Sequence, residues 1–168
     1  MKYSIWVIPP EPVFSEQKKI IQDLSFQYKS PCFNPHLTIW GNVDRDLNEI
    51  QKALEKVAVN ANELTLSLGP ISFSTTYYQS VFVRVNSTAR LMQLNLDIKE
   101  LLNLENKVFM PHMSLIYGNH DMKTREQITK NIKLQNSLFI VKEIVVIPEK
   151  PDPKDWRPVV TVPFGVRN

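Results

Sequence analysis

Apolar residues along the chain follow two spacings, one typical of strands and the other typical of helices. In residues 64–68, leucines alternate with hydroxyl residues, a pattern that predicts a half-buried strand ending at the turn Gly69-Pro70. In residues 15–28 the apolar positions recur every three or four residues, which predicts a helix that the hydroxyl of Ser15 caps.

The same analysis of the whole chain gives one order of elements twice. Strands are predicted over residues 4–8, 36–40, 64–68, 71–74, 80–85, 112–117, 138–147 and 159–164. Helices are predicted from Ser15, from Asp46, from Thr88 and across residues 122–132. The order β-α-β-α-β-β therefore repeats, and the halves meet near residues 75–80. We expect an α+β fold of one domain over residues 1–168, with two pseudo-symmetric lobes, antiparallel sheets facing a central cleft and helices outside.

Composition places the chain among ordinary globular proteins. Hydrophobic residues make up 43% of the 168 residues and charged residues 22%, which is enough apolar material for a core. The net charge of +3 favours an anionic ligand over a cationic one. It is far below the strongly basic field of a duplex-DNA binder, so we expect no DNA partner.

Several classes of site are excluded by the residues that are scarce. Four glycines leave no glycine-rich phosphate loop, and the single cysteine, Cys32, excludes an internal disulfide or a thiolate zinc cluster. An all-histidine metal site would need every one of the three histidines, so we expect no cofactor. The apolar run at the start is too short for a secretory signal, and no run reaches the ~20 residues of a membrane span. We expect a cytoplasmic protein without a membrane partner.

Two short segments in matching positions carry the candidate chemistry. Pro35-His36-Leu37-Thr38-Ile39 aligns with Pro111-His112-Met113-Ser114-Leu115, 76 residues further along the chain. Side chains at i and i+2 of a strand share one face, so His36 points with Thr38 and His112 with Ser114. Each lobe thus presents one imidazole beside one hydroxyl.

Two such pairs facing a cleft suit the hydrolysis of a phosphodiester. A neutral imidazole can take a proton from water while a protonated imidazole delivers one to the leaving oxygen. The hydroxyls can donate to phosphate oxygens that gain charge in the transition state, and no metal is required. The letters do not decide which histidine is the base; we take His112 as the base and His36 as the acid. A single histidine on a strand is usually structural, but packing needs no ionisable ring at both equivalent positions.

The paired motifs resemble those of the 2H phosphoesterase superfamily, and within it the cyclic phosphodiesterases of plants and yeast. The resemblance rests on segments 3–9, 33–38, 79–82 and 110–117, in the family's order. It implies a bilobal fold and hydrolysis of a nucleoside 2′,3′-cyclic phosphate or of ADP-ribose 1″,2″-cyclic phosphate to a phosphomonoester. His36 and His112 would then be the catalytic pair, and Thr38 and Ser114 would hold the phosphate.

The same resemblance suggests aromatic substrate contacts. They are Trp6, Tyr78 and Tyr117, whose flat rings can stack on a base or close a ribose pocket. Strict alternation from His112 sends Tyr117 to the opposite face, so it reaches the cleft only if the strand ends or bulges. Trp40, in contrast, shares parity with His36. The proline-rich segment 150–157 is interpreted as a loop at the rim, although Trp156 and Arg157 in it could touch a ligand.

Two alternatives remain open at this point. The same site could act on RNA ends, as RNA 2′,3′-cyclic phosphodiesterases and 2′-5′ ligases of the superfamily do, although the modest basicity gives little support for strand binding. A nucleotide-binding module without catalysis is the other, and the intact residues of both motifs argue against it. We therefore expect a monomer whose partner is a small cyclic-phosphate nucleotide, with RNA ends as the alternative.

Overall fold

The computed structural model describes residues 1–59 and 61–165 of the chain. Strands and helices alternate along most of the chain, apart from the consecutive strands β3 and β4 and the strands at the end. The elements, in chain order, are β1 (Tyr3–Val7), α1 (Val13–Tyr28), β2 (Leu37–Val43), α2 (Leu47–Val59), β3 (Leu64–Phe73), β4 (Val81–Val85), α3 (Ala89–Leu101), β5 (His112–Ile116), α4 (Met122–Asn131), β6 (Leu138–Val141), β7 (Glu143–Pro148), the short 3₁₀ helix η1 (Pro153–Asp155) and β8 (Val160–Pro163). None of these helices is both long and apolar enough to cross a membrane.

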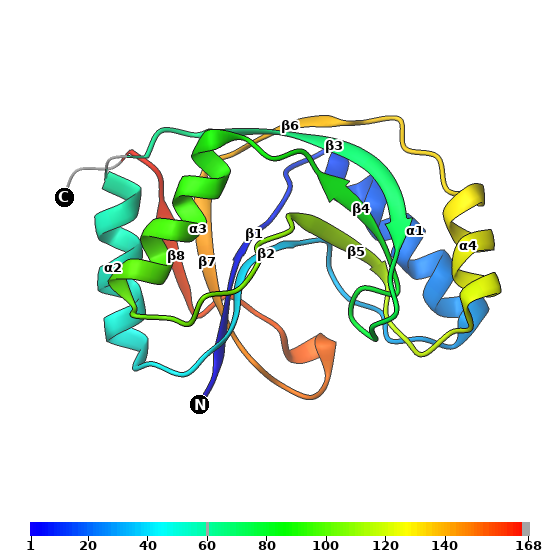
Figure 1. The fold of residues 1–168 in the computed structure, drawn as a ribbon, viewed down its shortest axis with the longest axis horizontal. Helices are drawn as coiled ribbons and strands as arrows, with labels where there is room; N and C mark the ends of the chain where they lie inside the picture. Colours follow the sequence, from blue (N-terminus) through cyan, green and yellow to red (C-terminus); the bar gives the residue numbers. More distant parts are fainter. Residues whose placement is uncertain (60, 166–168) are drawn as a thin grey trace.

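All eight strands belong to one antiparallel sheet, in the order β6-β3-β4-β5-β2-β1-β7-β8. The sheet is strongly curled, with α2 and α3 at one end of the molecule and α1 and α4 at the other (Figure 1). The α+β class is confirmed, but the expectation of two separate sheets is wrong. β2 and β5 join them through the pair Leu37 and Met113, so the two halves form one continuous sheet.

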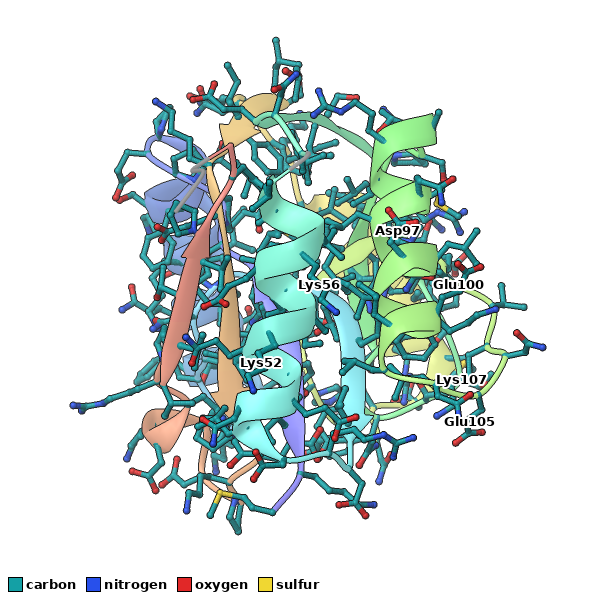
Figure 2. All side chains as sticks on the ribbon, turned by 90° about the vertical axis from the view of Figure 1, so that its left-hand side faces the viewer. Lys52, Lys56, Asp97, Glu100, Glu105 and Lys107 are labelled. Carbon is teal, nitrogen blue, oxygen red and sulfur yellow. The ribbon has the colours of Figure 1, made fainter. Side chains whose placement is uncertain are left out.

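The sheet has two halves that meet at this narrow junction: the first half-sheet is β2-β1-β7-β8 and the second is β5-β4-β3-β6. Each draws on both halves of the sequence. Helix α1, between β1 and β2, packs on β5 of the second half-sheet, whereas α2 packs on β8 of the first and on α3. Figure 2 shows α2 and α3 side by side, with Lys56 and Asp97 labelled on them.

Besides small shifts at strand ends, the structure divides two predicted regions into strands differently. Residues 64–73 form one strand, β3, because the turn expected at Gly69-Pro70 is a register shift between Leu68 and Ile71. A proline is tolerated there because a bulge needs no ladder hydrogen bond from it. The strand predicted over 138–147 is two strands separated at Lys142, since β6 pairs with β3 and β7 pairs with β1 across the sheet.

Helix starts follow the predicted caps in two cases out of three. Asp46 accepts from the backbone N–H of Asn48 at 2.9 Å, and Thr88 accepts from that of Leu91 at 3.2 Å. The cap predicted at Ser15 is wrong, because α1 begins at Val13. Ser15 lies in its first turn and donates its hydroxyl and its N–H to the carboxylate of Glu11.

Candidate active site

One cavity of about 530 Å³ is lined by residues of β1, β2, β5 and β7 and of the loops beside them, a volume typical of small-ligand pockets. All seven residues predicted for the site line it: Trp6, His36, Thr38, Tyr78, His112, Ser114 and Tyr117. The two motifs, distant in sequence, therefore meet in one cavity because β2 and β5 are neighbours at the centre of the sheet.

The two histidines are anchored in the same way. Nδ1 of His36 lies 2.7 Å from the carbonyl oxygen of Asn34, and Nδ1 of His112 lies 2.8 Å from that of Met110. A carbonyl can only accept, so each Nδ1 carries the proton and each Nε2 is left as the free ring nitrogen. The identical anchor two residues upstream fixes both the tautomer and the ring orientation.

An aromatic ring on the neighbouring strand accompanies each histidine. Trp6 pairs with Thr38 across β1 and β2, and Phe82 pairs with Ser114 across β4 and β5. The Trp6 ring stacks on His36 with centroids 3.6 Å apart, whereas Phe82 meets His112 edge-on at 5.2 Å. Sequence reasoning missed Phe82, although its place relative to the second motif matches that of Trp6 relative to the first.

The environments of the two imidazoles differ electrostatically. Burial lowers the pKa of His36 to about 4, against the opposing effect of the Asn34 carbonyl and with a smaller contribution from His112. Burial also lowers the pKa of His112, where the Met110 carbonyl opposes the shift and the cation of Arg84 adds to it. Both rings are therefore neutral at pH 7, and His36 is the harder of the two to protonate.

A bulge in each central strand decides which aromatic residues reach the cavity. Trp6 pairs with Thr38 and Ile5 with Trp40, so Ile39 is an extra residue in β2. Leu115 is likewise extra in β5, because Phe82 pairs with Ser114 and Val81 with Ile116. Each bulge reverses the alternation that follows it.

The consequences for the two sequence expectations are opposite. Tyr117 reaches the cavity because β5 bulges before it, as the sequence analysis required for this residue. Trp40 is turned away from it, so the parity expected with His36 does not hold. Its ring is buried in the core, and its Nε1 donates to the carbonyl of Asn95 on α3 at 2.9 Å.

The hydroxyl groups are held to different degrees. Tyr117 Oη lies 3.5 Å from His36 Nε2, and burial raises the pKa of this phenol, which keeps it protonated. Ser114 donates its hydroxyl to the carbonyl of Tyr78 at 2.6 Å and must rotate before it can donate to a ligand. The hydroxyl of Thr38 makes no hydrogen bond within residues 1–59 and 61–165 and is ready to donate.

The loop that carries Tyr78 is fastened by Arg125 of α4, a residue that sequence reasoning did not single out. This arginine exposes only 2% of its surface. Its guanidinium donates to four carbonyls, those of Ser74, Thr76, Gly118 and His120, at 2.6–3.1 Å. It therefore joins the 74–79 loop to the end of β5, next to Tyr117.

The rim loop after β7 contributes one of its two candidate contacts. Trp156 lines the cavity, meets Trp6 edge-on at 5.7 Å and donates its Nε1 to the carbonyl of Lys150 at 2.7 Å. Arg157 is exposed and is not among the lining residues. Within the described part of the chain, no group of three or more His, Cys, Asp or Glu side chains is arranged to hold a metal ion.

Comparison with known proteins shows the family of the chain. Residues 1–160 match the model of the family described as "Cyclic phosphodiesterase-like protein". The chain belongs to this family.

A curated relative is the cyclic phosphodiesterase of Arabidopsis thaliana, 28% identical to this family member over 117 residues. The match covers 69% of the chain and 65% of the relative, which is less than two thirds of the relative's length.

Solved structures share the fold of this cyclic phosphodiesterase-like chain. The protein TT0787 of Thermus thermophilus superposes with a TM-score of 0.69 at 13% identity, over all of both chains. Escherichia coli LigT in complex with 3′-AMP superposes with a TM-score of 0.65 at 15% identity, over 97% of both chains. At these identities the likeness concerns the fold.

Proposed function

We propose that the protein hydrolyses a ribose cyclic phosphate to a phosphomonoester, with His36 and His112 as an acid–base pair. The observation that carries the proposal is the matched anchoring of the two imidazoles, each with Nδ1 bound to a backbone carbonyl, in a single cavity. Family membership supports phosphodiester chemistry. The substrate is a nucleoside 2′,3′-cyclic phosphate or ADP-ribose 1″,2″-cyclic phosphate.

The unequal burial of the two rings supports a division of roles that reverses the sequence-based assignment. A base must be neutral in the free enzyme, and the deeper His36, with its pKa lowered to about 4, meets this condition across the physiological range. His112 is less buried and gains a proton more readily when an anionic phosphate lies beside it.

The reaction follows from these roles. Nε2 of His36 takes a proton from water as the water oxygen attacks phosphorus, and the bond between phosphorus and one ribose oxygen breaks. Nε2–H of His112 gives its proton to that oxygen, which leaves as a hydroxyl. Thr38 and Ser114 donate hydrogen bonds to the non-bridging oxygens as charge develops on them. Proton exchange with solvent then restores both histidines.

A small nucleotide suits the volume of the cavity and its aromatic lining. Structures of E. coli LigT, which has a similar fold, hold 3′-AMP, ATP and NADP⁺. The name of the Arabidopsis relative points to the same class of substrate.

The decisive experiment compares nucleoside 2′,3′-cyclic phosphates, ADP-ribose cyclic phosphate and RNA oligomers with cyclic ends. His36→Ala and His112→Ala should each lower turnover of the best small substrate by at least ~100-fold. His120→Asn is the matched control, since His120 does not line the cavity. Activity should persist in EDTA. Near-normal rates in both alanine variants, or a loss in EDTA that a divalent ion restores, would overturn the proposed mechanism.

A further inference from the structure

Glu149, the residue that follows β7, is the one carboxylate among the residues that line the cavity. Its charge is unfavourable near an anionic phosphate, unless it lies against a different part of the substrate. Lys150 also lines the cavity, but no ion pair joins it to Glu149 within the described residues.

Both hydrogen bonds to the Glu149 carboxylate fall on one oxygen. Oε1 accepts from the Ser4 hydroxyl at 2.9 Å and from the backbone N–H of Asn42 at 2.7 Å. The backbone N–H of Glu149 donates to the carbonyl of Lys2 at 2.9 Å. The carboxylate is thus fixed to β1 and β2, while Oε2 has no partner in residues 1–59 and 61–165.

The backbone around this carboxylate is shaped to hold it. Asn42 adopts φ of 59°, in the left-handed region that few residues other than glycine, asparagine and aspartate adopt. Such conformations persist where surrounding contacts enforce them and cluster at functional sites. In this conformation the N–H of Asn42 points at Oε1.

The position of Glu149 along the strand indicates which part of a nucleotide it meets. Thr38, the proposed phosphate donor, precedes Asn42 by four residues in β2, a separation of at most about 13 Å along a strand. The bulge at Ile39 shortens it. A nucleoside bridges this distance when its cyclic phosphate lies at Thr38, and its base then reaches the carboxylate.

We propose that Oε2 of Glu149 accepts a hydrogen bond from the exocyclic amine of the substrate's nucleobase and so selects amino-bearing bases over oxo-bearing ones. The inference rests on the proposed function and adds a specificity-determining residue to it. An acceptor fixed before binding costs little ordering entropy, and a hydrogen bond to a charged group discriminates strongly against a base that offers another acceptor.

The variant Glu149→Gln separates recognition of the base by Oε2 from the hydrogen bonds that hold the side chain through Oε1. Ser4 and Asn42 are both donors, so they hold the glutamine amide with its oxygen toward them. The amide NH₂ then occupies the place of Oε2. The hydrogen bonds from Ser4 and Asn42 are kept, while the group at the position of Oε2 changes from an acceptor to a donor.

The test measures kcat/KM for two matched pairs of 2′,3′-cyclic phosphates, cytidine against uridine and adenosine against inosine. The members of each pair differ mainly by an amine in place of a carbonyl. The wild type should favour cytidine and adenosine by about 10-fold or more, since a hydrogen bond to a charged group is stronger than one between neutral groups. Glu149→Gln should abolish or invert the preference. Glu143→Gln, an exposed glutamate at the other end of β7, should keep it.

The possible failures are distinguishable. If the wild type hydrolyses neither these four compounds nor ADP-ribose 1″,2″-cyclic phosphate, the proposed function itself is wrong. If it hydrolyses ADP-ribose 1″,2″-cyclic phosphate alone, the function stands and the selection among these bases by Glu149 is overturned. If it hydrolyses all four without preference, the function stands and base recognition by Glu149 is overturned. An equal loss on all four substrates in Glu149→Gln, with unchanged thermal unfolding, would overturn it too and indicate a ribose contact instead.

Discussion

The indole ring of Trp6 lies flat on the imidazole of His36, with ring centroids 3.6 Å apart and an angle of 11° between the planes. It covers one face of that imidazole and excludes water from it. Phe82 approaches His112 only edge-on, at 66°. The two motifs are equivalent in sequence, yet their histidines have different access to solvent and therefore different readiness to take a proton.

Removal of the indole should change how activity depends on pH. In Trp6→Ala, water reaches His36 and its pKa rises from about 4 toward 6.5. Since a base acts only when neutral, the acid limb of the pH profile of kcat/KM should shift to higher pH. Activity at pH 5 should therefore fall relative to activity at pH 7. Phe82→Leu, the matched change beside His112, should leave that limb in place. An acid limb unmoved in Trp6→Ala would contradict the role of His36 as base.

Stability should also depend on pH through His36. Its pKa is about 4 when folded and 6.5 when unfolded, so the unfolded chain binds more protons between these values. The free energy of unfolding should therefore be fully retained above pH 6.5. It should fall by up to about 1.4 kcal/mol per pH unit as the pH drops from 6.5 toward 4. Urea unfolding of wild type and His36→Gln at pH 7 and pH 4.5 measures this, and the variant should lose less. Equal losses would show that His36 is not the source.

A substrate whose leaving group needs no proton should show which histidine is the acid and which is the base. On thymidine 3′-(4-nitrophenyl phosphate), His112→Ala should lose less than ~10-fold, although it loses at least ~100-fold on a cyclic nucleotide. His36→Ala should be impaired on both substrates, because water must still be activated. The opposite pattern would restore the assignment drawn from sequence, with His112 as base.

The buried guanidinium of Arg125 should be a main support of the cavity wall. In Arg125→Met four carbonyls lose their donor, among them the buried one of Gly118, and we expect a loss of about 3 kcal/mol in the free energy of unfolding. Urea titration of the variant measures the loss. Lys123→Met, an exposed position on the same helix, is the control and should change stability by less than about 0.5 kcal/mol. Similar stability in both variants would show that the carbonyls find other partners.

Local patterns in the sequence predict most of the elements and the members of the site. The caps at Asp46 and Thr88 depend only on neighbouring residues, and the structure has them where the sequence places them. The motif histidines and hydroxyls line one cavity because a repeated motif in a repeated fold falls at equivalent positions.

Local sequence patterns do not predict features that depend on contacts with other parts of the chain. The bulges at Ile39 and Leu115 exist only relative to the residues they face on β1 and β4, so alternation alone misplaces Trp40. The burial of Arg125 depends in part on the carbonyls of Ser74 and Thr76, which lie 51 and 49 residues away in sequence, and arginine is ordinarily exposed. The join between β2 and β5 likewise involves a single residue pair and carries no signal in either strand.

The exchange of elements between the half-sheets also limits how a ligand enters. Helix α1 and the connections from α2 to β3 and from β6 to β7 cross from one half-sheet to the other. A rigid-body opening that separates the two half-sheets would strain each of these crossings. A ligand therefore enters with the two half-sheets in the arrangement that the structure shows, past the side chains that line the cavity, among them the exposed Tyr78.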